Sequence, residues 1–408
     1  MEVREPNARY LVKPGFKQTE VGVTPEDWGV STIGEEFTIQ LGKMLDAEKN
    51  VGLPKPFLGN RAVQWGRIDV TDVGEIKLAP SELQRFRLRD GDLLVCEGGE
   101  VGRCAIWRQP MDECYYQKAL HRLRPRRGFN ISLMLNLLHL YSMSGVLQNY
   151  VTQTSIAHLP KDKFETIPIP VPPTETEQQA IAEALSDADA LIEALEQLLV
   201  KKRQIKQGAM QELLTGQKRL PGFSGKWVER CIAEVADCLD NLRIPLNDSQ
   251  RVKIKGDYPY CGANGVLDYI DQYCVEDSVV LIAEDGGYFD EYLTRPIAYR
   301  MSGKFWVNNH AHILKSKPDS DQDFLFYSLV HKNVLNFLAS GTRAKLNKSE
   351  LNKIAIELPC DRLEQTAIAT VLSDLDAELA ALETKLAKAR HLKQGMMQEL
   401  LTGRIRLV

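Results

Sequence analysis

The sequence contains one long internal repeat, and this repeat strongly limits the folds open to the chain. Shifted by 187 residues, the stretch 178–220 matches 365–407 without a gap, and 27 of the 43 positions are identical. Both copies read Q-x-A-I-A-x-x-L-S-D-x-D-A and end in K-Q-G-x-M-Q-E-L-L-T-G. One pair of long copies indicates two copies of a single module rather than a solenoid of short units.

Apolar residues within each copy recur in steps of four and three. They are Ile181, Leu185, Ala188, Ile192, Leu195 and Leu199 in the first copy, and Ile368, Leu372, Leu375, Leu379, Leu382 and Leu386 in the second. This 3.5-residue period is typical of a coiled-coil seam. Pro172 and Pro173 precede the first copy, and Gly216 and Pro221 follow it, so each copy predicts a helix of ~36 residues.

Charge along the repeat predicts how the two helices pair. Each copy is acidic in its first half and basic in its second, as Asp187 and Glu193 before Lys201 and Lys206 illustrate. Antiparallel pairing sets acidic residues opposite basic ones, whereas parallel pairing sets like charges together. We therefore expect an antiparallel pair related by a pseudo-two-fold axis. The alternative is two amphipathic helices that each pack on their own domain.

The remaining sequence divides into two modules with the same layout. Stretches such as "GDLLVCEGG", "HRLRP", "DSVVLIAEDGG" and "WVNNHAHILK" predict short strands, and each module then turns to a helical stretch. The expected fold class is α+β, with two mixed domains joined by a long antiparallel two-helix coiled coil. The expected boundaries are 1–175 for the first domain, 176–216 for the first helix, 217–362 for the second domain and 363–408 for the second helix.

Length and composition fit this organisation. A chain of 408 residues suits two or three domains, and its net charge of −4 means that any nucleic-acid surface must be local. The eight cysteines form no C-x-x-C pair, the first residues resemble no signal peptide, and no apolar run approaches 18 residues. We therefore expect a cytoplasmic protein without a membrane span.

Paired motifs give the modules a resemblance to a known family. "VGVTPEDW" (21–28) and "LPGFSGKW" (220–227) open the modules, and "LPKDKFETIPIPVPPTETEQQAIA" and "LNKSELNKIAIELPCDRLEQTAIA" close them. With the doubled "KQGxMQELLTG", they resemble the DNA-specificity subunit of Type I restriction-modification systems over essentially the whole chain.

The resemblance implies a function and a set of partners. It implies that each recognition domain reads half of an asymmetric, bipartite site in double-stranded DNA, and that the helices set the spacing. The matching helix surfaces would dock two methyltransferase subunits and also restriction subunits. S-adenosylmethionine, ATP and magnesium would then belong to those partners, and no cofactor to this chain.

The chain itself offers no sign of catalysis. It contains neither a P-loop nor an Asn/Asp-Pro-Pro-Tyr/Phe motif, so we expect a non-catalytic subunit. "CEGGEVG" (96–102) and "AEDGG" (283–287) predict tight turns between strands that allow close approach of the backbone to DNA. His310 and His312 lie two residues apart on a predicted strand and could bind a metal, but a DNA-binding or structural role is favoured, and no metal site is predicted.

Candidate DNA contacts in the first module come from two stretches. The basic run "YYQKALHRLRPRRG" predicts phosphate contacts near Tyr115 and Tyr116, and the polar side chains of "FLGNRAVQWGRID" suit base edges. The residues are Asn60, Arg61, Gln64, Arg67, Lys118, His121, Arg122, Arg124, Arg126 and Arg127. The alternatives are a strand edge blunted by arginine and simple exposure.

The second module is less basic, which places more weight on neutral polar side chains. "VNNHAHILK" occupies the place of 116–124 in the first module, with His312 opposite His121, and "YCGANGVLDY" suits either a groove contact or a hairpin turn. The candidate residues are Tyr260, Asn264, Asn308, Asn309, His310, His312, Arg343, Lys345 and Lys348.

Two other functions remain open from the sequence. One is the specificity half of a fused or related restriction system. The other is a coiled-coil adaptor that binds protein and not DNA. Two diverged modules on a nearly identical spacer argue against the adaptor, because an adaptor has no evident need to vary two equivalent domains.

Overall fold

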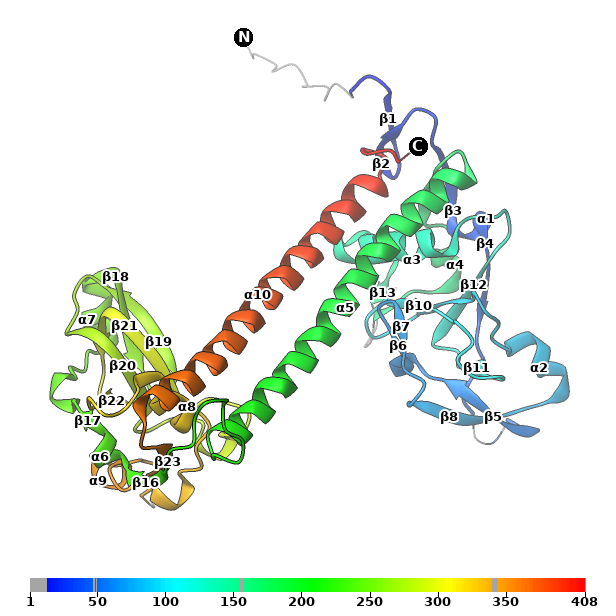
Figure 1. Cartoon of the computed structure of the whole chain (residues 1–408). Coiled ribbons are helices and arrows are strands. Elements are labelled where there is room, and N and C mark those ends of the chain that lie inside the picture. The colour runs from blue at the N-terminus through cyan, green and yellow to red at the C-terminus, as the bar shows by residue number, and fades with distance from the viewer. Residues whose placement is uncertain (1–12, 47, 49, 154–156, 340–343, 408) are drawn as a thin grey trace, which may run out of the picture. The chain divides into compact units, whose positions relative to one another are not determined.

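The chain forms two compact units, and the computed structural model describes residues 13–46, 48, 50–153, 157–339 and 344–407. Unit 1 comprises Met1–Leu195 and Lys385–Val408, and unit 2 comprises Glu196–Thr384 (Figure 1). Each unit therefore takes one half of each of the two long helices, α5 (Glu175–Leu213) and α10 (Arg362–Leu400).

Unit 1 is built around a four-stranded sheet of order β10-β9-β12-β4 and a three-stranded sheet of order β11-β5-β8. The four-stranded sheet comprises β4 (Phe37–Leu41), β9 (Leu93–Cys96), β10 (Cys104–Ile106) and β12 (Leu120–Pro125). The three-stranded sheet comprises β5 (Leu53–Leu58), β8 (Val73–Leu78) and β11 (Tyr115–Tyr116). Two-stranded pairs are β1 (Phe16–Thr19) with β2 (Gly22–Pro25), β3 (Gly29–Thr32) with β15 (Pro168–Val171), β6 (Val63–Gln64) with β7 (Arg67–Ile68), and β13 (Thr152–Gln153) with β14 (Ala157–His158). The helices are α1 (Ile33–Glu36), α2 (Pro80–Phe86), α3 (Ile131–Met143) and α4 (Lys161–Glu165).

The four-stranded sheet of unit 1 is covered on both faces. Alternate residues of β9 enter different hydrophobic clusters: Leu93 and Val95 join the cluster that contains Trp28, whereas Leu94 and Cys96 join the cluster that contains Trp107. Because side chains alternate between the faces of a strand, β9 and its neighbour β12 are buried on both sides. Polar residues of β12 therefore cannot all face solvent.

Unit 2 is built around a six-stranded sheet of order β17-β22-β20-β21-β18-β19. Its strands are β17 (Ala236–Cys238), β18 (Lys255–Gly262), β19 (Gly265–Ile270), β20 (Val275–Ala283), β21 (Ala298–Val307) and β22 (Ala311–Ser316), and β16 (Trp227–Cys231) pairs with β23 (Ala355–Pro359). The helices are α6 (Ile232–Val235), α7 (Asp248–Lys253), α8 (Gln322–Leu329) and α9 (Lys348–Leu351). The predicted strand and helix stretches quoted for this module are confirmed.

Each long helix contributes to both cores. Ile181 and Leu185 of α5 lie in the main core of unit 1, and Leu213 of the same helix lies in the main core of unit 2. Ile368 of α10 belongs to unit 2 and Leu400 to unit 1. The alternative of two helices that each pack on their own domain is therefore wrong. Within the described part of the chain, no helix is long and apolar enough to cross a membrane.

Ion pairs confirm the antiparallel arrangement in each unit. In unit 1, Lys393 Nζ lies 2.5 Å from Asp189 Oδ1, and in unit 2, Lys206 Nζ lies 2.5 Å from Asp376 Oδ1. These four residues are two pairs of repeat equivalents, so the two units contain the same contact. The late basic half of one helix meets the early acidic half of the other, as the charge pattern predicts.

The repeated Q-E-L-L-T-G sequence forms the same helix end in both units. Gly216 and Gly403 close α5 and α10 with φ of 67° and 70°, a left-handed conformation that favours glycine. A Cβ at Gly216 would lie 3.0 Å from the Trp227 ring, and a Cβ at Gly403 would lie 2.5 Å from Pro25 and 3.2 Å from Trp28. Each glycine thus lets a helix end pack against the tryptophan that opens a module.

A buried ion pair joins each helix end to the start of the other long helix. In unit 2, Arg219 Nε and Nη2 donate to the two carboxylate oxygens of Glu364 at 2.5 and 2.7 Å. In unit 1, Arg406 forms the same two-pronged contact with Glu177. Both glutamates are fully buried. The repeated residues therefore fasten the closing end of one copy to the opening of the other.

Candidate nucleic-acid interface

In both units, a central strand of the main sheet ends in a glycine-containing loop that starts with glutamate. Glu97 follows β9 and Glu284 follows β20, and the two are equivalent under the shift of 187 residues. Glycines with positive φ turn each loop, at Gly99 and Gly102 in unit 1 and at Gly286 in unit 2. The predicted tight turns are therefore confirmed.

The same hydrogen bonds hold each of these loops. Glu97 N donates to Ala119 O at 2.9 Å, and Leu159 N donates to Glu97 O at 2.7 Å. In unit 2, Glu284 N donates to His310 O at 2.9 Å, and Leu346 N donates to Glu284 O at 2.7 Å. The equivalent backbone groups are thus fixed in the same way in both units.

Asparagine side chains brace both loops. Asn60 Nδ2 donates to Gly98 O at 2.8 Å in unit 1, and Asn264 Nδ2 donates to Gly286 O at 2.9 Å in unit 2. Asn264 also lies in the tight connection between β18 and β19, which confirms the hairpin-turn interpretation of this residue. We call each glutamate loop, its bracing asparagine and the segments that flank it a loop cluster.

The structure brings several predicted residues together at these loop clusters. In unit 1, Lys118 is exposed directly before Ala119, and Asn60 is half-buried. In unit 2, Asn309 is exposed, and His310 Nδ1 lies 2.6 Å from Asp285 Oδ1. Lys345 Nζ lies 2.8 Å from Glu284 Oε1. Polar side chains from distant parts of the sequence thus meet at one edge of each main sheet.

Two equivalent histidines lie beneath the loop clusters, and neither reaches the surface. His121 Nε2 lies 2.9 Å from Leu159 O, and His312 Nε2 lies 2.7 Å from Leu346 O, so the predicted correspondence of these histidines is confirmed. Both side chains are almost fully buried. The prediction that they contact DNA is wrong, because they act as struts inside each unit.

The chemical surroundings of the two histidines differ. Burial lowers the pKa of His121 to about 4. His312 Nδ1 instead faces Asp240 Oδ2 at 2.7 Å and Glu284 Oε2 at 3.6 Å. With Cys238, His312 and Asp240 place possible metal-ligand atoms within 4.8 Å of one another. However, Arg243 lies 3.1 Å from Asp240 and also pairs with Glu284, and this positive charge disfavours a cation there.

The basic run of the first module is largely part of the core. Arg122 is buried and donates to Arg85 O and Gln40 Oε1, and Arg124 forms a two-pronged ion pair with the buried Asp92. Tyr115 and Tyr116 are also buried. The prediction of phosphate or base contacts by Arg122, Arg124 and these tyrosines is therefore wrong, because β12 is a central strand.

The other basic residues of this run remain exposed. Arg126 Nε donates to Thr38 Oγ1 at 3.1 Å, and Arg127 lies 3.7 Å from Glu36, yet both side chains are largely in solvent. Arg61 and Arg67 are also exposed, whereas Gln64 Nε2 donates to Arg61 O at 2.7 Å. These residues stay predictions for DNA contact.

Two predicted contacts of the second module are buried instead. Tyr260 is enclosed, and its hydroxyl donates to Leu246 O at 3.2 Å, while Asn308 Oδ1 accepts from His310 N at 2.8 Å. Their side chains are unavailable to DNA, so these two predictions are corrected. Lys348 is exposed and donates to Cys238 O at 3.1 Å, and Arg343 lies outside the described residues.

Sequence reasoning missed the acidic members of the loop clusters. Glu97 and Glu284 lie inside the two glycine-containing stretches that the sequence singles out, and the repeat shift superimposes them. That correspondence could have identified both glutamates. Arg243 and His158 carry no comparable signal, since only the folded chain brings Arg243 to Glu284 and His158 to the loop of Glu97.

Comparison with known proteins identifies the architecture. The family model described as the Type I restriction modification DNA specificity domain matches residues 25–205 and again residues 224–389. The chain belongs to this family. Its two specificity domains are the two modules that the repeat predicts, and such a chain serves as a sequence-specific DNA recognition subunit.

Relatives and solved structures agree with this assignment. A specificity subunit described for the type I restriction enzyme MjaX of Methanocaldococcus jannaschii is 24% identical over 442 residues, which cover 98% of each chain. A type I specificity subunit from Haemophilus influenzae is 39% identical over 161 residues, 40% of each chain. The crystal structure of the S subunit of a Type I restriction-modification system from M. genitalium has the same fold, with a TM-score of 0.64, 16% identity and coverage of 91% of this chain and 96% of that one.

Proposed function

We propose that this specificity-domain protein reads an asymmetric, two-part DNA site, with one half of the site assigned to each unit. The observation that supports this proposal is the loop cluster itself, which has one backbone framework and two different sets of polar side chains. Unit 1 offers Glu97 and Lys118, whereas the equivalent positions of unit 2 hold Glu284 and Asn309. Base edges in the major groove are distinguished by donor and acceptor patterns, so different side chains select different bases.

The chain would direct chemistry that partner subunits perform. In this proposal two methyltransferase subunits bind the repeated helix surfaces, since equivalent surfaces accept identical partners. Restriction subunits complete the assembly, and S-adenosylmethionine, ATP and magnesium belong to these partners. The cytoplasm is the compartment in which such a complex meets DNA.

Exposed apolar side chains on the long helices support a docking role. Leu191, Val200 and Ile205 of α5 are 47%, 54% and 44% exposed, and Leu392 of α10, the repeat equivalent of Ile205, is 60% exposed. In unit 2, Ile205, Ala209 and Leu213 also line a groove of about 460 Å³. A helix that meets only water normally turns charged residues outward, so these residues favour contact with another subunit.

The proposal is tested by single-molecule sequencing of genomic DNA from cells that carry the methyltransferase partner, with and without this gene. We expect N6-methyladenine to disappear from one asymmetric two-part motif when the gene is removed. An unchanged methylation pattern would refute the proposal and favour a protein-binding adaptor. The family match favours the DNA-reading function over the adaptor.

A second test addresses the role of the helices as a spacer. Each helix has 39 residues and is roughly 58 Å long, and one heptad corresponds to roughly 10 Å or about three base pairs. Removing one heptad from the middle of both helices should shorten the gap between the half-sites and leave each half unchanged. Methylation by this variant at the original spacing would contradict the spacer role.

A further inference from the structure

A half-buried carboxylate in unit 1 has no structural task that accounts for it. Among the residues that the structure describes, the Glu97 carboxylate forms no hydrogen bond or ion pair. Burial raises its pKa above the ordinary range, while the charges of Lys118 and His158 oppose this rise. Partly desolvating a carboxylate without a partner is unfavourable, so an unfilled interaction is the feature to explain.

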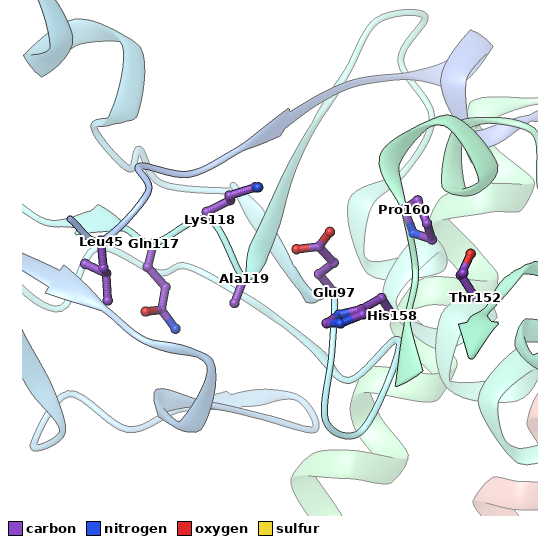
Figure 2. Close-up of a pocket in the computed structure, with 8 residues that line it drawn as sticks. All are labelled: Leu45, Glu97, Gln117, Lys118, Ala119, Thr152, His158 and Pro160. Atoms are coloured by element: carbon purple, nitrogen blue, oxygen red, sulfur yellow. The ribbon is translucent and has the colours of Figure 1, made fainter. Parts of the chain in front are cut away.

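Glu97 points into an open pocket that Lys118 also lines. The pocket has a volume of about 520 Å³, and its other polar lining residues are Gln117, Thr152 and His158. Figure 2 shows the Glu97 carboxylate between the side chains of Lys118 and His158. The pocket therefore presents one strong acceptor beside one strong donor.

The backbone beneath both side chains is fixed. Glu97 N and O are each hydrogen-bonded to neighbouring segments, and Lys118 N donates to Lys43 O at 2.8 Å. Gly98 leaves room for the next segment, since a Cβ there would lie 3.2 Å from His158 Nδ1. The two side chains thus project from a framework that can position them repeatedly against the same target.

The equivalent glutamate of unit 2 shows what a structural role looks like. Glu284 is nearly buried and pairs with Arg243 and with Lys345, so its charge is fully compensated within the unit. The position equivalent to Lys118 is Asn309, because Ala119 and His310 accept the same backbone hydrogen bond. Structural need explains Glu284 and leaves Glu97 unexplained.

The chemistry of the Glu97 and Lys118 pair matches one base pair better than the others. A carboxylate accepts a hydrogen bond from N4 of cytosine, and an ammonium donates to O6 and N7 of guanine. Adenine also offers an amino group, but its acceptor N7 lies beside that group and would face the carboxylate. Thymine presents only the O4 acceptor to Lys118 and adds a methyl group.

We propose that Glu97 and Lys118 read one C·G base pair in the half-site of unit 1, with Glu97 accepting from cytosine N4 and Lys118 donating to guanine. This inference rests on the proposed function and adds the residues and the base pair. Unit 2 cannot read its half-site in this way, because its glutamate is already paired and asparagine replaces the lysine.

The test uses the full chain in cells with its methyltransferase partner, and reads the methylated motif by single-molecule sequencing. In Glu97→Gln, the half-site of unit 1 should lose its preference for C·G at one position by roughly tenfold to a hundredfold. A gain of A·T is expected there, since an amide suits adenine N6 and N7. The half-site of unit 2 should not change. Glu75→Gln, on the exposed edge of β8, is the matched control and should leave the whole motif intact.

A second variant protects the inference against loss of folding. Lys118→Ala removes an exposed side chain and should relax the same position as Glu97→Gln. If both folded variants keep the wild-type motif, or lower methylation equally at all sites, the inference is overturned and Lys118 is a phosphate contact at most. The same holds if the half-site of unit 1, identified by exchanging that module with another family member's, contains no C·G pair. The proposed function fails separately, if the wild-type chain directs no motif at all.

Discussion

The two units keep the same framework and differ where their polar side chains meet. The helix-end glycines, the buried Arg–Glu pairs and the histidine struts recur at equivalent positions. In contrast, Glu284 pairs with Arg243 and Lys345, whereas Glu97 has no partner among the described residues. The difference teaches that identity is retained where the units close their cores and relaxed where they face a ligand.

The largest effect should come from breaking the shared closure. Arg219→Ala and Arg406→Ala each leave a fully buried glutamate without its partner, which should lower the free energy of unfolding by about 3–5 kcal/mol. Denaturant unfolding of the full chain measures this loss. Arg404→Ala, which removes a largely exposed arginine, is the control and should cost under about 0.5 kcal/mol. A large loss in only one of the two closure variants would break the comparison.

A smaller effect should separate the two histidines by pH. The pKa of His121 falls from 6.5 to about 4 on folding, so the unfolded chain takes up the proton first as the pH drops. Stability present above pH 6.5 is therefore lost between pH 6.5 and 4, by up to about 3 kcal/mol.

His121→Gln should remove that part of the pH dependence. Unfolding free energies at pH 7 and pH 5 provide the measurement, with His391→Gln at an exposed position as the control. If His121→Gln keeps the wild-type loss between these pH values, the buried neutral histidine is not its cause.

The helix-end glycines should reveal a modest difference between the units. Alanine at either Gly216 or Gly403 must adopt a positive φ, which costs roughly 1–2 kcal/mol. Gly403→Ala should be the more harmful, because its Cβ would lie 2.5 Å from Pro25, compared with 3.0 Å from Trp227 at Gly216. Thermal unfolding of both variants decides this order, and a reversed order would show that the ring at Trp227 yields less readily than the proline.

The smallest effect concerns the helix–helix ion pairs. Lys206→Ala and Lys393→Ala should each lower stability by less than about 1 kcal/mol, since these pairs lie near solvent. Exchanging the charges in Asp189→Lys with Lys393→Asp should restore most of the loss of either single change. A double variant less stable than both single variants would argue against the antiparallel pairing in unit 1.

The sequence predicted the long helices because their signals are local and repeated. The seam residues, the charge pattern and the helix-end glycines all lie within one continuous stretch of each copy. The basic run on β12 was misleading for a different reason. His121 and Arg122 look like an exposed basic strand, but β12 lies between β9 and β4 and is covered on both faces. Which strand is central depends on pairing between distant segments, and a single sequence does not display that pairing.

The same limit applied to the loop clusters. Glu97 and Glu284 are equivalent in sequence, yet only one is paired, because Arg243 reaches Glu284 from a segment 41 residues away. Lys345 arrives from the other side of unit 2. Sequence could identify the two glutamates as a pair, and only the fold could distinguish them.

The division of each helix between two cores has a consequence for the order in which the protein is made. Unit 2 is one continuous segment, 196–384, whereas unit 1 needs Met397, Leu400 and Leu401 beside Trp28. During synthesis, domains generally fold as their residues emerge, from the N-terminus onward. The unit that is translated first must therefore wait for the last helix turn before it closes, with its apolar surface open while the other unit is assembled.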